Sequence, residues 1–246
     1  MKLIPLGVAG AYTAPGEASP GYLLEKDNQY ILIDAGPGIT GRLAKFVNYA
    51  KLKAIIVSHL HFDHMLDLLP LSYALYIKGK SVPLYFPFET KNMLIGTYRA
   101  NNIMKFLESF IMFDSKGSIQ VGPFKVTFLP VKHRIATVGV RVETEDGALA
   151  YSGDSAYCEN LIKLAKDADI FLSEATYLEK DKHRTEEGHM AAKEAALIAK
   201  EANVKKLLLT HIWFEYDKVD SLKEAKRVFK KVEIAQEMKI YNIVPY

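Results

Sequence analysis

One short stretch constrains the fold of this chain more than any other: Ser58-His59-Leu60-His61-Phe62-Asp63-His64. It holds three of the seven histidines of a 246-residue chain. The apolar run 54–57 comes directly before it. A short, continuous, β-branched run of this kind is typical of a strand buried on both faces. The polar stretch therefore follows a buried strand, which is where open α/β sheets bind their ligands.

The residue types of this stretch are those of a metal site. Imidazole and carboxylate groups are good ligands for zinc and its first-row neighbours. If the strand continues through His61, the side chains of His59 and His61 point the same way and can hold one ion together. Asp63 and His64 follow on the turn, where they can face a second ion. The alternative is a polar loop with solvated histidines, and the scarcity of histidine argues against it.

Three later apolar runs also end at a potential ligand. Residues 128–131 lead to His133, residues 148–151 lead to Asp154, and residues 207–210 lead to His211. If these strands run alike, their polar groups meet at the same edge of a parallel-biased layer. Taken alone, His133 or His211 is more simply a buried, hydrogen-bonded histidine. A chance scatter of histidines would not select strand ends, however, so in company with the first stretch both are candidate ligands.

The motif His59-x-His61-x-Asp63-His64, continued by His133, Asp154 and His211, resembles the signature of the metallo-β-lactamase superfamily of metal-dependent hydrolases. The likeness is closest to the phosphodiesterase-like and ribonuclease Z-like members, and it covers nearly the whole chain. It implies an α/β fold, a four-layer αββα sandwich, with residues 1–246 as a single domain. It also implies two divalent ions, one held by His59, His61 and His133, the other by Asp63, His64 and His211, with Asp154 bridging them. Zinc is the expected metal, and manganese or iron would also suit such ligands.

The same resemblance assigns catalytic roles. It implies a hydroxide shared by the two ions that attacks a phosphodiester or a related ester, with Asp63 required for activity. His189 matches a histidine of the ribonuclease Z-like pattern and is expected to act on the leaving group, as a general acid or as a substrate contact. Glu174, in the matching stretch 173–176, is expected to hold His189 or a ligand histidine in place. The threonine that this pattern usually has two residues after the histidine is Ala191 here.

Other segments carry local predictions. The turn Asp34-Ala35-Gly36 is similar to the family's Asp-x-Gly turn, in which the aspartate supports the metal ligands. Apolar periodicity predicts an amphipathic helix over 39–50, and 89–109 is expected to be helical. The sequence Ser221-Leu222-Lys223-Glu224 has the form of a capping box, which predicts that a helix opens there.

Composition narrows the function classes. The net charge of +3 is too small to indicate a nucleic-acid partner by itself. Asp154 follows His133 by 21 positions, which leaves room for one hairpin but not for the tRNA-gripping arm of ribonuclease Z.

The single cysteine, Cys158, excludes an intramolecular disulfide and a cysteine-based zinc site. The apolar part of residues 1–10 is too short for a signal peptide and no run approaches a membrane span, so we expect a cytoplasmic protein without a membrane partner.

The sequence thus predicts a binuclear metal-dependent hydrolase of a small-molecule ester, with a phosphodiester as the first choice. Two alternatives stay open. One is tRNA 3′ processing by an armless ribonuclease Z-like endonuclease, which would make nucleic acid the substrate. The other is a non-catalytic, metal-containing binding or carrier protein of the same fold. The apolar stretch 66–77 is consistent with a core helix, a pocket wall or a homodimer interface.

Overall fold

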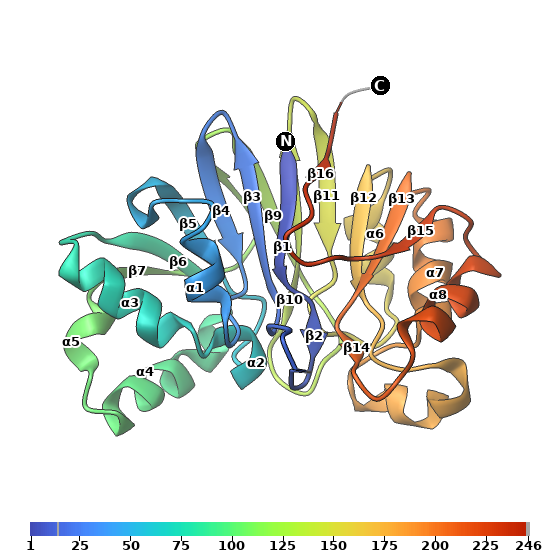
Figure 1. Cartoon of the computed structure of the whole chain (residues 1–246), viewed down its shortest axis with the longest axis horizontal. Coiled ribbons are helices and arrows are strands. Elements are labelled where there is room, and N and C mark those ends of the chain that lie inside the picture. Colours follow the sequence, from blue (N-terminus) through green and yellow to red (C-terminus); the bar gives the residue numbers. More distant parts are fainter. Residues whose placement is uncertain (14, 245–246) are drawn as a thin grey trace.

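Two facing β-sheets form the centre of the molecule in the computed structural model, which describes residues 1–13 and 15–244 (Figure 1). Within these residues each main sheet has seven strands. The first runs in the order β16 (Tyr241–Asn242), β1 (Lys2–Gly7), β3 (Gly21–Lys26), β4 (Gln29–Ile33), β5 (Leu52–Ile56), β6 (Val82–Phe86), β7 (Phe110–Asp114). The second runs in the order β15 (Val232–Ile234), β13 (Lys206–Thr210), β12 (Ile170–Glu174), β11 (Gly147–Tyr151), β10 (Val138–Thr144), β9 (Phe124–Pro130), β8 (Ser118–Val121). A two-stranded sheet joins β2 (Ala9–Gly10) to β14 (Ile212–Trp213).

Helices cover the outer face of each sheet (Figure 1). The first sheet is covered by α1 (Ile39–Leu43), α2 (Phe62–Met65), α3 (Leu68–Ile77), α4 (Lys91–Ala100) and α5 (Met104–Leu107), and the second by α6 (Glu159–Ala165), α7 (Ala192–Glu201) and α8 (Lys218–Lys226). Successive strand residues face opposite sides, so Ile31 and Ile33 of β4 join the core between the sheets while Leu32 packs toward the helices. A third buried cluster lies between the second sheet and its helices. The predicted four-layer αββα sandwich is confirmed.

Strand direction brings the candidate ligands together. In the second sheet β9 and β11 are both antiparallel to β10, and β12 and β13 run parallel to β11. The carboxyl ends of these four strands therefore share one edge, where His133, Asp154, Glu174 and His211 lie. In the first sheet β4 and β5 are parallel and end just before Asp34 and the 58–64 stretch. The predicted common edge is thus divided between two facing sheets, rather than belonging to one layer.

Three local predictions were wrong in detail. β5 ends at Ile56, and His61 is the N-cap residue of α2, so the strand does not continue through it. The helix predicted over 39–50 stops at Leu43, and η1, a 3₁₀ turn, follows at Tyr49–Lys51. The helix predicted over 89–109 is split into η2 (Phe88–Thr90), α4 and α5, because Asn102 has a left-handed backbone that ends α4.

The predicted capping box at Ser221 was also wrong. Helix α8 already begins at Lys218, because the Asp217 side chain accepts a hydrogen bond from the Val219 N–H at 2.8 Å. Asp is a strong N-cap residue and precedes Ser221 by a full turn. Ser221 is instead buried inside the helix.

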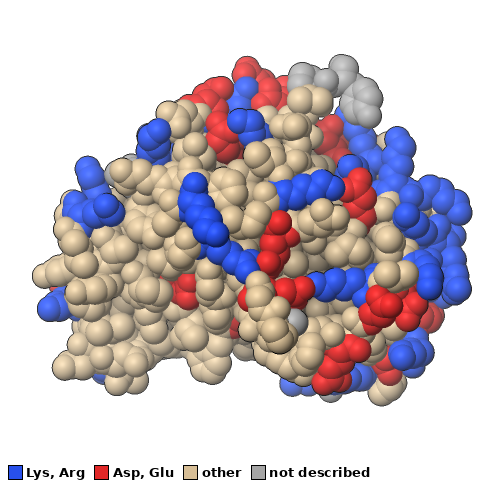
Figure 2. All heavy atoms as spheres, in the orientation of Figure 1, with Lys and Arg blue, Asp and Glu red and all other residues tan. Residues whose placement is uncertain are grey.

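The stretch 66–77 is mainly a core helix. Leu68, Leu71 and Leu75 of α3 are buried against the first sheet, while Tyr73 and Ile77 are exposed. Figure 2 shows few charged residues on the side of the molecule where α3, α4 and α5 lie. No helix in the described part of the chain combines the length and the apolar character that a membrane crossing needs.

Candidate metal centre

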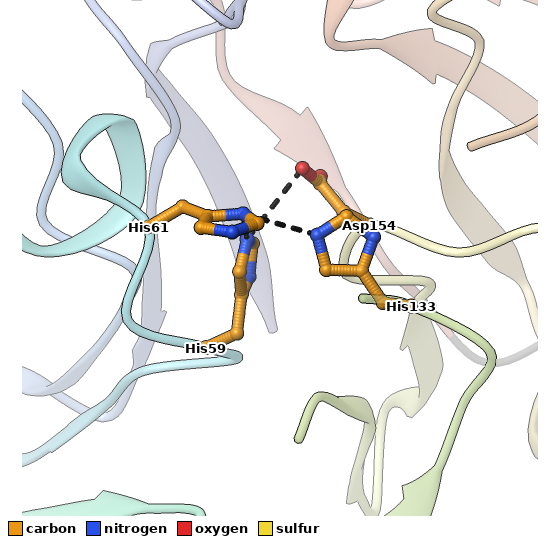
Figure 3. Close-up of side chains that lie close together, drawn as sticks. All are labelled: His59, His61, His133 and Asp154. Atoms are coloured by element: carbon orange, nitrogen blue, oxygen red, sulfur yellow. Dashed lines mark hydrogen bonds and ion pairs between the residues drawn. The ribbon is translucent and has the colours of Figure 1, made fainter. Parts of the chain in front are cut away.

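Three imidazoles and a carboxylate meet at the junction of the sheets (Figure 3). His59 Nε2 and His133 Nε2 each lie 3.0 Å from Nδ1 of His61. Asp154 Oδ2 is 3.6 Å from His59 Nε2. The candidate ligand atoms of these four residues all lie within 4.8 Å of one another. They come from the β5–α2 turn, the β9–β10 connection and the end of β11, so only the folded chain brings them together.

A second group lies directly beside the first and shares Asp154 with it. This second group consists of Asp63, His64, Asp154 and His211. One candidate ligand atom from each of these residues lies within 4.8 Å of those of the other three. Asp63 Oδ2 is 3.1 Å from His211 Nε2 and 3.4 Å from His64 Nε2. Asp154 Oδ2 lies 3.3 Å from His64 Nε2 and 3.4 Å from His211 Nε2. One oxygen of Asp154 therefore faces both groups.

Hydrogen bonds fix which ring nitrogens face inward. Nδ1–H of His133 donates to the Gly188 carbonyl at 2.7 Å, and Nδ1–H of His64 donates to Asp34 at 2.8 Å. A carbonyl or a carboxylate can only accept, so in the neutral rings each Nε2 carries a lone pair. Ser58 Oγ is 3.0 Å from His59 Nδ1 and gives its own proton to Asp34, so His59 is oriented in the same way. Nε2 of each of these rings therefore faces the carboxylates, where a metal ion or a proton would balance the negative charge.

Thr176 orients His211 by the same logic. Its hydroxyl donates to Glu174 Oε2 at 2.6 Å and therefore accepts from His211 Nδ1 at 2.9 Å. The Ala11 N–H points at His211 Nε2 at 3.4 Å, which is consistent with a lone pair on that atom. His211 has a left-handed backbone, φ 52°. Such conformations are strained for a non-glycine residue and are held by surrounding structure, here the pairing of β14 with β2.

Buried polar atoms that lack a hydrogen-bond partner indicate whether a cation would fit this site. Among the described residues, His64 Nε2 and Asp154 Oδ1 are buried and make no hydrogen bond. Such groups are rare because losing water without replacement is costly. Both belong to the candidate ligand set, and divalent metal ions are the partners that suit imidazole nitrogen and carboxylate oxygen. The donor set therefore fits divalent metal ions.

The electrostatics of the two groups differ. Burial lowers the pKa of His59, His61 and His133, so these rings are neutral near pH 7. Burial also opposes a charge on His64, but the carboxylates of Asp154, Asp63 and Asp34 outweigh it and raise the pKa of His64 well above its ordinary value. The pKa of Asp63 and that of Asp154 stay well below the usual range, since neighbouring histidines overcome the effect of burial. The carboxylates thus attract positive charge strongly, whether as a proton or as a metal ion.

Asp34 holds candidate ligand residues in place through hydrogen bonds, as the turn motif predicted. The residue is fully buried and its carboxylate accepts four hydrogen bonds. They come from Ser58 N–H at 2.7 Å, Ser58 Oγ at 3.0 Å, His64 Nδ1 at 2.8 Å and Tyr151 Oη at 2.8 Å. One carboxylate therefore orients His64 directly and His59 through Ser58.

His189 lies over the site, next to Glu174. Its Nδ1 is 3.1 Å from Glu174 Oε1, and its ring stacks on His211 with centroids 5.6 Å apart. Burial would lower the pKa of His189, but Glu174 and then Asp154 raise it to about 9. Glu174 is itself fixed, since its Oε1 accepts from the Ser155 N–H at 2.7 Å. The third group of potential ligands contains Glu174, His189 and His211.

Four further residues orient the candidate ligands although no role for them was predicted from the sequence: Ser58, Thr176, Tyr151 and Gly188. Ser58 and Thr176 lie within the stretches already singled out, so a small hydroxyl residue beside a ligand was a usable signal. Tyr151 and Gly188 gave none, because their contacts depend on how distant segments pack. Arg184 lies 4.8 Å from the Tyr177 ring centroid and 4.4 Å from that of Trp213, so it covers aromatic rings beside the site.

Comparisons with known proteins agree with this geometry. The family described as "Beta-lactamase superfamily domain" matches residues 29–212. "Probable metallo-hydrolase YhfI" of Bacillus subtilis is 33% identical over 245 residues, covering 96% of this chain and 97% of the relative. Its crystal structure has a TM-score of 0.85 to this chain at 31% identity, covering 98% of this chain and 99% of that one.

Ribonuclease Z proteins are also similar. "Ribonuclease Z" of Ignicoccus hospitalis is 27% identical over 293 aligned positions, which cover 96% of each chain. The crystal structure of the short form of human tRNase Z has a TM-score of 0.80 at 21% identity and covers 99% of both chains. At that identity the likeness shows the fold alone.

Proposed function

Because this chain belongs to the metallo-β-lactamase superfamily and resembles a metallo-hydrolase over nearly its whole length, we propose that it is a binuclear metal-dependent hydrolase of a small phosphodiester or related ester. The observation that carries this proposal is the place of Asp154 Oδ2, which faces both ligand groups at once. We propose His59, His61 and His133 as ligands of one ion, Asp63, His64 and His211 as ligands of the other, and Asp154 as the bridge. Zinc is the first choice, with manganese and iron as alternatives.

In the proposed reaction the ions and the residues that orient their ligands have different roles. Two divalent ions, when bound, supply a water of lowered pKa and stabilise the attacking and leaving oxygens of a displacement. Hydrogen bonds from the surrounding residues keep the ligand nitrogens pointed toward the proposed ions. The partners in these bonds are Asp34, Ser58, Thr176 and the Gly188 carbonyl. Preorientation of this kind removes the cost of arranging ligands at the moment of reaction.

We propose that His189 donates a proton to the leaving oxygen. Glu174 holds its Nδ1, so the Nε2 side of the ring is free to face the substrate. Glu174 raises the pKa of His189, and the protonated imidazole that this favours is the state a general acid needs. Replacement of His189 by Asn is expected to lower kcat by about 10²- to 10⁴-fold with a smaller change in KM, which is the usual range for a general acid.

The test is hydrolysis of bis-p-nitrophenyl phosphate by purified protein reconstituted with zinc, manganese or iron. Asp63→Ala is expected to abolish the metal-restored activity. Asp220→Ala is the matched control, because Asp220 is a half-exposed acid on α8, away from the site. Equal activity of Asp63→Ala and the control would contradict the ligand assignment.

A substrate panel separates the remaining readings. Cleavage of precursor tRNA at its 3′ end would favour the ribonuclease Z-like alternative, which the Ignicoccus relative suggests. The single β10–β11 hairpin between His133 and Asp154 argues against it, because no arm is present there. Absence of turnover on any phosphodiester, thioester or lactone, with metal bound, would favour the non-catalytic binding protein.

We also propose that residues 1–246 act as one domain and form a homodimer through the weakly charged side over α3 and α5. Tyr73, Tyr76 and Ile77 of α3 are between 46% and 66% exposed there. Contiguous exposed apolar surface of this kind often marks an interface. Sedimentation of the wild type against Ile77→Lys tests the dimer, and a monomeric wild type would exclude it.

A further inference from the structure

Three rings of the described residues surround the His189 imidazole. The His211 ring stacks on it, with centroids 5.6 Å apart and planes 14° apart. The rings of His133 and Tyr177 meet it nearly at right angles, with centroids 5.0 Å and 6.0 Å away. His133 and His211 belong to the two ligand groups, so Tyr177 is the one member of this trio that is not a proposed metal ligand. Tyr177 is buried.

A single hydrogen bond does not fix the plane of an imidazole. His189 Nδ1 lies 3.1 Å from Glu174 Oε1, which holds one atom of the ring. Rotation about this contact would still swing Nε2 away from the ligand groups, and contacts on the ring itself are needed to prevent it. A displacement of about 1 Å at a reacting group can cost about 10²-fold in rate. The rings around His189 therefore matter for a group that has to reach a leaving oxygen.

The main chain of Tyr177 also holds the segment that carries His189. The Tyr177 N–H donates to the Met190 carbonyl at 3.2 Å, and the Ala192 N–H donates to the Tyr177 carbonyl at 3.0 Å. Tyr177 and Ala191 thereby form a parallel bridge. His189 precedes the first residue of α7, so it lies outside the helix. The same bridge that fixes its backbone places the Tyr177 ring against its imidazole.

The surroundings of Tyr177 fix its own ring. The Arg184 guanidinium lies 4.8 Å from the Tyr177 centroid and 4.4 Å from the Trp213 centroid. The rings of Trp213 and Tyr177 have centroids 5.8 Å apart, with planes 38° apart. A cation over two aromatic rings is attracted by both. The Tyr177 ring is therefore held before a substrate arrives and does not have to be ordered when one binds.

We propose that Tyr177 is a positioning residue, whose ring keeps the His189 imidazole in the plane in which Nε2 faces the leaving oxygen. This inference rests on the proposed function, in which His189 protonates that oxygen. A positioning residue acts through the group that it holds, so its loss should matter only where that group matters. Proton donation matters most for a strongly basic leaving oxygen and little for a weakly basic one.

Two esters that differ only in their leaving group test the proposal. The nitrophenolate that leaves methyl p-nitrophenyl phosphate is a weak base, whereas the phenolate that leaves methyl phenyl phosphate is a stronger one, with a conjugate-acid pKa of about 10 as in tyrosine. In the zinc-reconstituted protein, Tyr177→Leu is expected to lower kcat for the phenyl ester about 10- to 100-fold and kcat for the nitrophenyl ester less than about threefold. Tyr177→Phe keeps the ring and should retain kcat on both esters within about threefold.

Tyr98→Leu is the matched control, because Tyr98 is also buried but packs in the cluster between the first sheet and its helices. It is expected to change kcat on both esters less than about twofold. In a His189→Asn background, Tyr177→Leu should add less than about twofold, since the group that it positions is gone. Equal losses of Tyr177→Leu on the two esters, or its full effect in the His189→Asn background, would overturn the proposal.

The mobility of the His189 ring gives a readout that needs no turnover. Its NMR order parameter, measured at Cε1–H with and without zinc, is expected to fall in Tyr177→Leu and to stay unchanged in Tyr177→Phe and Tyr98→Leu. An unchanged order parameter in Tyr177→Leu would overturn the positioning role. A lowered order parameter in a protein that hydrolyses no ester would retain that role and reject the proposed function instead.

Discussion

Asp34→Asn is the substitution whose effect follows most directly from the structure. The buried carboxylate accepts four hydrogen bonds, three of them on Oδ2 and one on Oδ1. An asparagine amide keeps one oxygen and turns the other acceptor into a donor. In one orientation the NH₂ faces the Ser58 N–H, and in the other it faces three donors. At least one bond is lost and the rest lose charge assistance.

The expected cost is about 3–5 kcal/mol of unfolding free energy, since a hydrogen bond to a charged group contributes about 1.5–3 kcal/mol and a buried donor is left unpaired. Zinc affinity should also fall about 10- to 100-fold, because His64 and, through Ser58, His59 lose the group that orients them. Urea unfolding of the metal-free protein measures the first effect. Zinc titration against a chromophoric chelator measures the second.

Tyr151→Phe is the matched control. It removes one of the four donors and leaves the carboxylate, so the expected cost is only about 1 kcal/mol, with zinc affinity changed less than about threefold. The reasoning is refuted if Asp34→Asn unfolds within about 1 kcal/mol of the wild type and binds zinc equally well. It is also refuted if both variants lose the same zinc affinity, because the charge would then play no part.

Three further outcomes are expected. Zinc at about 100 times its dissociation constant should add about 2.7 kcal/mol to the unfolding free energy for each ion bound, and Tm should rise. A chelator should reverse this, and Asp154→Ala should show a much smaller shift. Gly188→Ala should reduce bound zinc measured by elemental analysis, because Gly188 has φ +101° and an added Cβ would lie 2.7 Å from His133 Nδ1; unchanged zinc content would contradict this. In the metal-free protein, NMR should find His189 protonated up to about pH 9. Glu174→Gln should lower the pKa of His189, because the carboxylate that raises it is gone. An unchanged pKa in Glu174→Gln would show that a group other than Glu174 raises it.

Much of the fold could be predicted because its signals are local. Each candidate ligand except those on α2 follows an apolar run, and such runs form strands whatever their partners are. The turn at Asp34 was also predictable, since Asp34 and Gly36 belong to one short Asp-x-Gly motif. Helix ends were predicted less well, as the early start of α8 at Asp217 shows, because competing caps differ by only about 1 kcal/mol.

The amino-acid sequence by itself determined the chemical types of the site: imidazoles and carboxylates, delivered at strand ends, in a set that suits divalent cations. Only the tertiary structure decided that two facing sheets share the site and that Asp154 faces both groups. It also decided that Ser58, Thr176 and Gly188 fix the orientation of the rings. The reason is that strand formation depends on neighbours in the chain, whereas a hydrogen bond from His133 to Gly188, 55 residues away, exists only once the layers have packed.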